Sequence, residues 1–199
     1  GHGAGADGMM MGIGDEPFDA ALLIGYHARA GAKGGIMEHT ITGGIHRLRI
    51  NGVEHGEIGL AMGVAALYGV PVVAVSSDAA GCDEFTAYKT GGAAAETKAG
   101  YGRYMGKLWH PSDTGEVIFQ AVQAGLKSRS KVKPLSFDGP QVVEIEFNRQ
   151  EEANTVAKLQ GFTQVDGYTV RAERKTYREA HTVIWNAVGM SGPGADSGN

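Results

Sequence analysis

The chain has 199 residues, 42% of them hydrophobic, so it is long enough to bury a core as one large or two small domains. Its formal net charge of -4 and pI of about 6.0 give no broad electrostatic reason to bind nucleic acid or an acidic membrane surface. Its 32 glycines follow no collagen-like period, which favours a loop-rich α/β protein over a fibrous or disordered one.

The amino-terminal region is rich in glycine and alanine. It lacks a basic stretch followed by an apolar one, so we expect no signal peptide. Residues 1–8 contain the pattern GxGxxG, but no strand precedes it, so a nucleotide site there is only an alternative to an exposed glycine loop or a fragment start.

In the first half of the chain, apolar strand and helix patterns alternate, which predicts an α/β fold with a mostly parallel sheet and flanking helices. A Gly-Val-Pro sequence divides the long apolar run 58–78 into two elements, so an apolar helix followed by a buried strand explains this run better than a membrane span does. Asn51-Gly52 predicts a type I′ hairpin turn. The expected strands are 20–26, 45–50, 71–76 and 93–98, and the expected helices are 58–68, 78–88 and one that begins at Pro111.

In the second half, the composition changes near residues 131–140, and shorter elements follow. We predict strands at 142–147 and 168–172, helices at 150–159 and 176–188, and a mobile tail at 191–199. We therefore divide the chain into an α/β domain, residues 1–133, and a smaller α+β domain, residues 134–199. Cys82 is the only cysteine, which excludes an internal disulfide and favours a cytoplasmic protein.

Two histidines and a glutamate on glycine-flanked segments form the candidate site. His27 follows the first predicted strand, at the sheet edge where ligands gather in α/β proteins, and His39 and Glu57 follow it along the chain. Imidazole and carboxylate groups bind zinc, and a histidine can also transfer protons near neutral pH. Because the spacing differs from the HExxH motif, a metal site and ordinary structural roles both remain open on the pattern alone.

The segments GYHARA, MEHT, ING and GEIGL, between Asp15 and Pro71, resemble the zinc-dependent D-aminopeptidases of dipeptide-transport operons, the DppA-type family. A looser similarity extends over nearly the whole chain. The resemblance implies a two-zinc centre with His27 and Glu57 as ligands, and His39 as the catalytic nucleophile or general acid/base. It also implies that short peptides, including those with D-residues, are the substrates, and that the protein is a homo-oligomer, a decamer in the characterised type.

The sequence also departs from that family. Its SxDxEG strand and its DSH-like segment, which supply further zinc ligands, do not occur here, so the chain resembles such an enzyme with its first strand and helix missing. Either residues upstream were removed or are unrecorded, or this polypeptide cannot complete a two-zinc centre by itself. With only His27 and Glu57 as ligands, we expect weaker zinc binding.

We expect a cytoplasmic metallo-aminopeptidase in which a zinc-activated water attacks the amide bond. Arg29 is expected to bind a substrate carboxylate, unless it forms a structural salt bridge. The alternatives are a non-catalytic oligomeric scaffold or truncated family member, and a nucleotide-binding α/β module.

Overall fold

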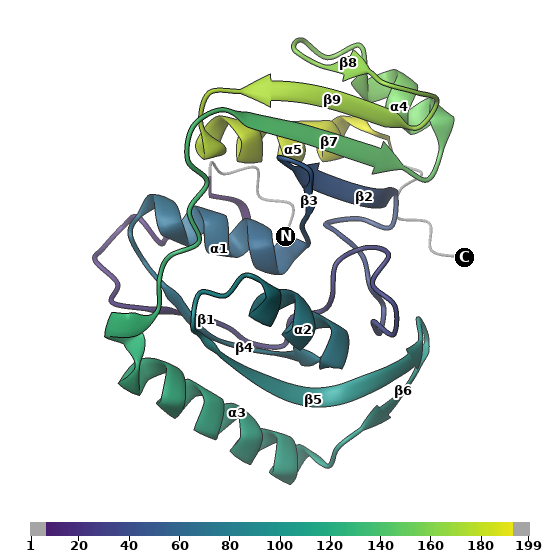
Figure 1. Cartoon of the computed structure of the whole chain (residues 1–199). Helices are drawn as coiled ribbons and strands as arrows, with labels where there is room; N and C mark the ends of the chain where they lie inside the picture. Colours follow the sequence, from purple (N-terminus) through teal and green to yellow (C-terminus); the bar gives the residue numbers. More distant parts are fainter. Residues whose placement is uncertain (1–6, 193–199) are drawn as a thin grey trace.

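The computed structural model describes residues 7–192 and folds them into two β-sheets, with helices between and outside them (Figure 1). Most of the GxGxxG pattern in residues 1–8 and most of the expected mobile tail, 191–199, lie outside the described residues. No helix among residues 7–192 is both long enough and apolar enough to cross a membrane.

The first sheet confirms the predicted, mostly parallel α/β arrangement. Its order is β1 (Ala21–Leu23), β4 (Val72–Asp78), β5 (Ala93–Gly102) and β6 (Met105–Leu108), and only the β5–β6 pair is antiparallel. The helices α2 (Ala79–Ala87) and α3 (Pro111–Lys127) pack on β4 and β5, from opposite faces in Figure 1. Covered on both faces, β4 is buried at every position, as expected for the interior strand of a parallel sheet.

The helix α1 (Glu57–Leu67) lies between the two sheets and is apolar on all sides. Every residue from Ile58 to Ala65 is buried, which is the pattern of a helix enclosed in a core. It packs against α2 and against α5 (Tyr177–Met190). One cluster of buried side chains runs from the first sheet through α1 into the second sheet.

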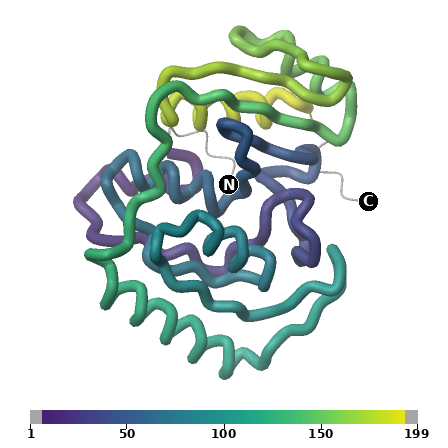
Figure 2. The backbone as a smooth tube through the Cα atoms, viewed as in Figure 1, coloured from purple at the N-terminus to yellow at the C-terminus, as the bar shows by residue number. Residues whose placement is uncertain are grey.

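The second sheet is antiparallel and joins segments that lie far apart in the sequence. Its order is β3 (Val53–Glu54), β2 (Ile45–Ile50), β7 (Gln141–Phe147), β9 (Thr169–Arg174) and β8 (Thr163–Gln164). Figure 2 shows the blue segment 45–54 beside the green and yellow segments. The domain boundary at residue 133 stays a prediction, but it separates strands that pair in one sheet.

The connections follow the local chemistry of the sequence. Asn51 and Gly52 both have positive φ angles, as the predicted type I′ turn between β2 and β3 requires. α4 (Gln150–Val156) and α5 pack on β7 and β9, and a capping box of Thr176 and Glu179 starts α5. Two short 3-10 helices, Gly8–Met10 and Arg129–Lys131, complete the described elements.

Candidate metal centre

The segment that carries His27 continues past β1 along the carboxyl end of β4. The backbone N–H of Tyr26 donates to the Ser76 carbonyl at 2.9 Å, and the Ser77 hydroxyl donates to the Tyr26 carbonyl at 2.8 Å. Gly25 has a φ of 77°, a left-handed conformation that favours glycine at this bend. His27 therefore lies at the carboxyl edge of the parallel sheet, where the sequence placed it.

The loop after this segment folds back and brings His39 against His27. The His39 N–H approaches the Ala28 carbonyl at 3.4 Å, and the Ala30 N–H donates to the Thr40 hydroxyl at 3.1 Å. The two imidazole rings are stacked, with centroids 3.9 Å apart and planes 16° from parallel.

Glu57 is the first residue of α1, and its carboxylate faces both histidines. Its Oε1 lies 3.4 Å from His27 Nε2 and 3.6 Å from His39 Nε2, and it accepts the Ile41 N–H at 2.9 Å. A carboxylate in the first turn is also favoured by the partial positive charge of the helix N-terminus. The three predicted residues thus come together from the start of α1, the loop before β2 and the segment that follows β1.

The hydrogen bonds of the two histidines fix which ring nitrogen is free. His27 Nδ1 lies 3.0 Å from the Ala28 carbonyl and His39 Nδ1 lies 2.7 Å from the Met37 carbonyl. A carbonyl only accepts hydrogen bonds, so each Nδ1 is assigned a proton, and in the neutral form of either ring a bare Nε2 faces Glu57. Three acceptor atoms therefore face one another, an arrangement that a shared proton or a metal cation stabilises.

The donor set fits zinc. One ligand atom from each of the three residues lies within 4.8 Å of the others. Zinc bonds of ~2.0–2.2 Å in a tetrahedron place donors about 3.3–3.6 Å apart, close to both nitrogen–oxygen distances seen here. Neutral imidazole nitrogens and a carboxylate are also the ligand types that zinc accepts.

The same geometry sets the protonation of the His27–Glu57 pair. Burial disfavours charge on His27, but hydrogen bonds to Glu57 and to the Ala28 carbonyl outweigh it, and the pKa of His27 is raised. Burial also disfavours the Glu57 carboxylate, yet its interactions with His27 outweigh that cost, and the pKa of Glu57 is lowered. The site therefore favours a negative Glu57 beside a positive charge, which either a proton or a metal ion can provide.

Arg29, the predicted substrate-binding residue, forms no described hydrogen bond with His27, His39 or Glu57. Its Nη1 lies 2.6 Å from Glu54 Oε2, so the structural salt bridge exists. Arg29 also lines a cavity of about 470 Å³ together with Lys33, Asp83 and Glu84. Its role in substrate binding stays a prediction.

Two carboxylates that the sequence analysis did not single out accept hydrogen bonds from the backbone segments around the site. Asp78, at the end of β4, is fully buried and accepts the Ile36 N–H at 2.7 Å through Oδ2. Its position at the end of an apolar strand could have indicated it in the sequence, because ligand sites in α/β proteins lie at the carboxyl ends of the strands. Glu84 accepts backbone N–H groups of Arg29 and Gly56, which lie 55 and 28 positions away, so no local pattern could have indicated it.

The chain is similar to known D-aminopeptidases in sequence and in structure. A family model described as D-aminopeptidase matches residues 2–186. A D-aminopeptidase of Bacillus subtilis (strain 168) is 32% identical over 171 residues, which are 85% of this chain and 62% of that protein. The solved structure of the Zn-dependent D-aminopeptidase DppA from Bacillus subtilis, described as a self-compartmentalizing protease, has a TM-score of 0.88 at 29% identity. That match covers 94% of this chain and 68% of the other, so this chain spans about two thirds of the length of these relatives or slightly less.

Proposed function

Because the chain belongs to the D-aminopeptidase family, we propose that it is a zinc-dependent aminopeptidase that removes amino-terminal residues, D-residues included, from short peptides. The observation that carries the proposal is the convergence of His27 Nε2, His39 Nε2 and Glu57 Oε1 at the carboxyl edge of the parallel sheet. The reaction is inferred from the two relatives, which are described as D-aminopeptidases. The three side chains offer a place for the metal ion.

In this proposal, His27 and Glu57 hold zinc, and His39 moves protons. A bound zinc would polarise the scissile carbonyl and lower the pKa of a water toward ~7. The Nδ1–H of His39 is anchored on the Met37 carbonyl, which leaves Nε2 to accept a proton from the attacking water and return it to the leaving amine, or to act as the nucleophile. Arg29, at the cavity wall, binds a substrate carboxylate.

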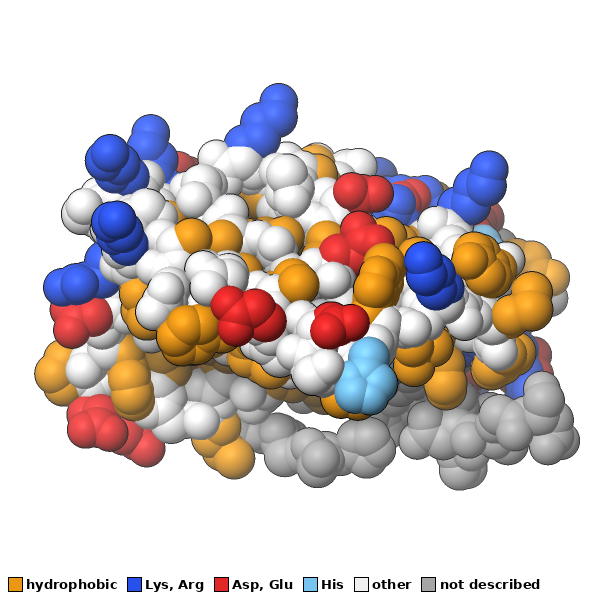
Figure 3. Space-filling model, turned by 90° about the horizontal axis from the view of Figure 1, so that it is seen from below, with side chains coloured by type: hydrophobic (Ala, Val, Ile, Leu, Met, Phe, Trp, Pro, Cys, Tyr) orange, Lys and Arg blue, Asp and Glu red, His pale blue; other side chains and the backbone are white. Residues whose placement is uncertain are grey.

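The proposal extends to the assembly and to the number of metal ions. We propose a cytoplasmic homo-oligomer, a decamer by resemblance, with two zinc ions in each complete site. The description of DppA as self-compartmentalizing supports self-association. So do exposed apolar side chains, which Figure 3 shows scattered over one face of the molecule. Those exposed on α3 include Val117, Phe119 and Leu126.

The test compares His39→Ala with His46→Ala. His46 is exposed, bonds Asn148 and is not one of the three candidate donors, so it serves as the matched control. We expect His39→Ala to lower kcat/KM for a D-alanyl peptide by roughly 10²–10⁴-fold, the usual contribution of a proton-transfer group, while zinc content is retained.

Three results contradict parts of this proposal. Activity of His39→Ala near that of the wild type rules out a catalytic role. Loss of zinc from His39→Ala identifies His39 as a ligand instead. A wild-type protein that binds no zinc and cleaves no peptide, with or without chelator, is a non-catalytic scaffold, the competing hypothesis.

A further inference from the structure

Glu84, on α2, links the two backbone segments that carry the proposed zinc ligands. Its Oε2 accepts the Arg29 N–H at 2.7 Å and its Oε1 accepts the Gly56 N–H at 3.0 Å. The first amide lies two residues after His27, and the second immediately precedes Glu57. One carboxylate thereby bridges a sheet-edge segment and the start of α1, which packs against α2 (Figure 1).

The absence of a side chain at Gly56 allows this link. A Cβ at position 56 would lie 2.6 Å from the Arg29 Cβ and 2.8 Å from Glu84 Oε1, both closer than real Cβ contacts. Gly56 has a φ of -104°, which any residue can adopt, so close approach of the backbones explains the glycine better than conformation does. The small residue at this position leaves room for the two segments to approach, and Glu84 bonds both.

We propose that Glu84 is a positioning residue: it holds the His27 and Glu57 segments at the separation at which their side chains share one metal ion. This inference rests on the proposed zinc function of the same site. Ligands held in place by hydrogen-bonded neighbours bind metal more tightly, because less freedom is lost on binding. Glu84 makes no described hydrogen bond to the donor atoms, and its two bonds go to the backbones that carry them. Its charge also acts on His27 across space and contributes to the raised pKa of that ring, so the exchange of the two amides is the measurement specific to positioning.

The test is Glu84→Gln, which keeps the size of the side chain. A glutamine has one acceptor oxygen and an NH₂ group without a lone pair, so one of the two amides loses its partner. We expect zinc affinity, measured by competition with a chromophoric chelator, to fall about 10–100-fold, the usual effect of losing a group that orients ligands. Peptidase activity should then require correspondingly more free zinc.

The matched control is Glu152→Gln, on α4. Glu152 is also a buried carboxylate, 4% exposed, but its helix packs on the second sheet. We expect this variant to leave zinc affinity unchanged, whatever it does to the free energy of unfolding. An equal loss of zinc affinity in both variants would assign the effect to general destabilisation and overturn the inference.

Amide hydrogen exchange tests the link without zinc. In the metal-free protein, Glu84→Gln should speed exchange at Arg29 and Gly56 and leave the amides of β4 protected. A folded variant with unchanged zinc affinity and unchanged exchange at both amides overturns the proposal. If Glu84→Gln does not fold, Gly56→Ala replaces it, because the added Cβ would push the two segments apart. We expect the same loss of zinc affinity from that variant. If the wild type binds no zinc, the proposed function fails, while the exchange data still decide whether Glu84 joins the segments.

Discussion

At the scale of single residues, backbone carbonyls orient the histidines of the site. The carbonyls of Ala28 and Met37 each take an Nδ1–H, so His27 and His39 expose the same nitrogen to the same carboxylate. The sequence supplies both partners locally, one and two residues from the rings, so each histidine carries its own support. Only the meeting of the two rings depends on the loop between them.

Cys82 shows how burial suppresses the chemistry of a side chain. It lies on the buried side of α2, 7% exposed, and burial raises the pKa of its thiol to about 11. At pH 8 its thiolate fraction is then about 100-fold below that of a thiol with a pKa near 9. We expect a disulfide reagent at pH 8 to label the folded protein at least about 100-fold more slowly than protein unfolded in guanidinium.

The same thiol gives a pH dependence of definite sign. Between pH 9 and 11 the unfolded thiol ionises while the folded one keeps its proton, so the free energy of unfolding falls as the pH rises. Denaturant melts across this range should show a smaller fall for Cys82→Ala than for the wild type. A second result would contradict the burial itself: equal rates of labelling by the disulfide reagent in the folded and the unfolded protein would show that the folded thiol is accessible and ionisable.

At the scale of elements, the packing of α1 on α5 depends on a glycine. A Cβ at Gly63 would overlap the ring of Tyr177, which is buried and donates its hydroxyl hydrogen to the Leu60 carbonyl at 2.8 Å. We expect Gly63→Ala to lower the free energy of unfolding by about 1–3 kcal/mol, because an overpacked core has to shift. Chemical denaturation measures the change.

Gly189, on α5, is the matched control for that substitution. A Cβ there has nothing within 4 Å, so only the helix propensity changes. Gly189→Ala should stabilise the protein by roughly 0.5–1 kcal/mol. If Gly63→Ala stabilises it to the same extent, the close contact between α1 and Tyr177 is absent in solution.

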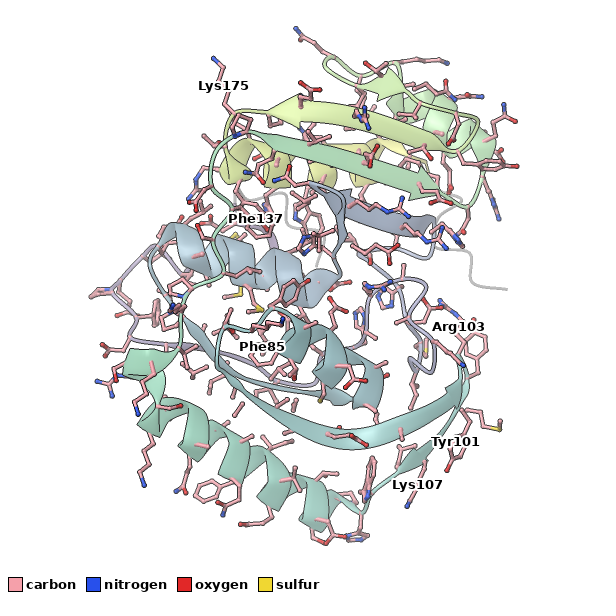
Figure 4. The ribbon with its side chains drawn as sticks, in the orientation of Figure 1. Phe85, Tyr101, Arg103, Lys107, Phe137 and Lys175 are labelled. Atoms are coloured by element: carbon pink, nitrogen blue, oxygen red, sulfur yellow. The ribbon has the colours of Figure 1, made fainter. Side chains whose placement is uncertain are left out.

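The same elements show what local sequence can predict. The helix 78–88 and the strand 71–76 match α2 and β4 within two residues, because apolar periodicity and Asp78 as a cap define them locally. β6 and β8 were not predicted. β6 contains a glycine and mostly exposed residues, and it is a strand because it pairs with β5, at the hairpin end where Figure 4 shows Tyr101 and Arg103.

At the scale of the whole molecule, the limit of sequence reasoning is long-range pairing. The alternation in residues 45–50 predicted a strand but not its sheet, and β2 pairs with β7, so that Ile50 lies beside Val143. The candidate ligands were predicted individually. Their meeting depends on β4, α2 and α1 packing together, and the role of Glu84 exists only in that packed state.

A metal held by segments from different elements should stabilise the whole fold. The unfolded chain does not hold His27, His39 and Glu57 within 4.8 Å, so zinc binds the folded state preferentially. At a free zinc concentration 100 times the Kd, the gain is about 2.7 kcal/mol, or roughly 5–10 °C in Tm for a chain of this size. Differential scanning calorimetry at fixed protein concentration, with zinc and then with chelator, measures the shift.

Two controls make the interpretation of that shift specific. Glu57→Gln removes the shared carboxylate, so its Tm should not respond to zinc. Magnesium should not replace zinc in the wild type, because it prefers an octahedron of oxygen ligands and the proposed ligands here include the imidazole nitrogen of His27. A Tm that rises equally with zinc in the wild type and in Glu57→Gln would place the ion elsewhere on the chain, and the convergence of the three side chains would then need a proton rather than a metal to explain it.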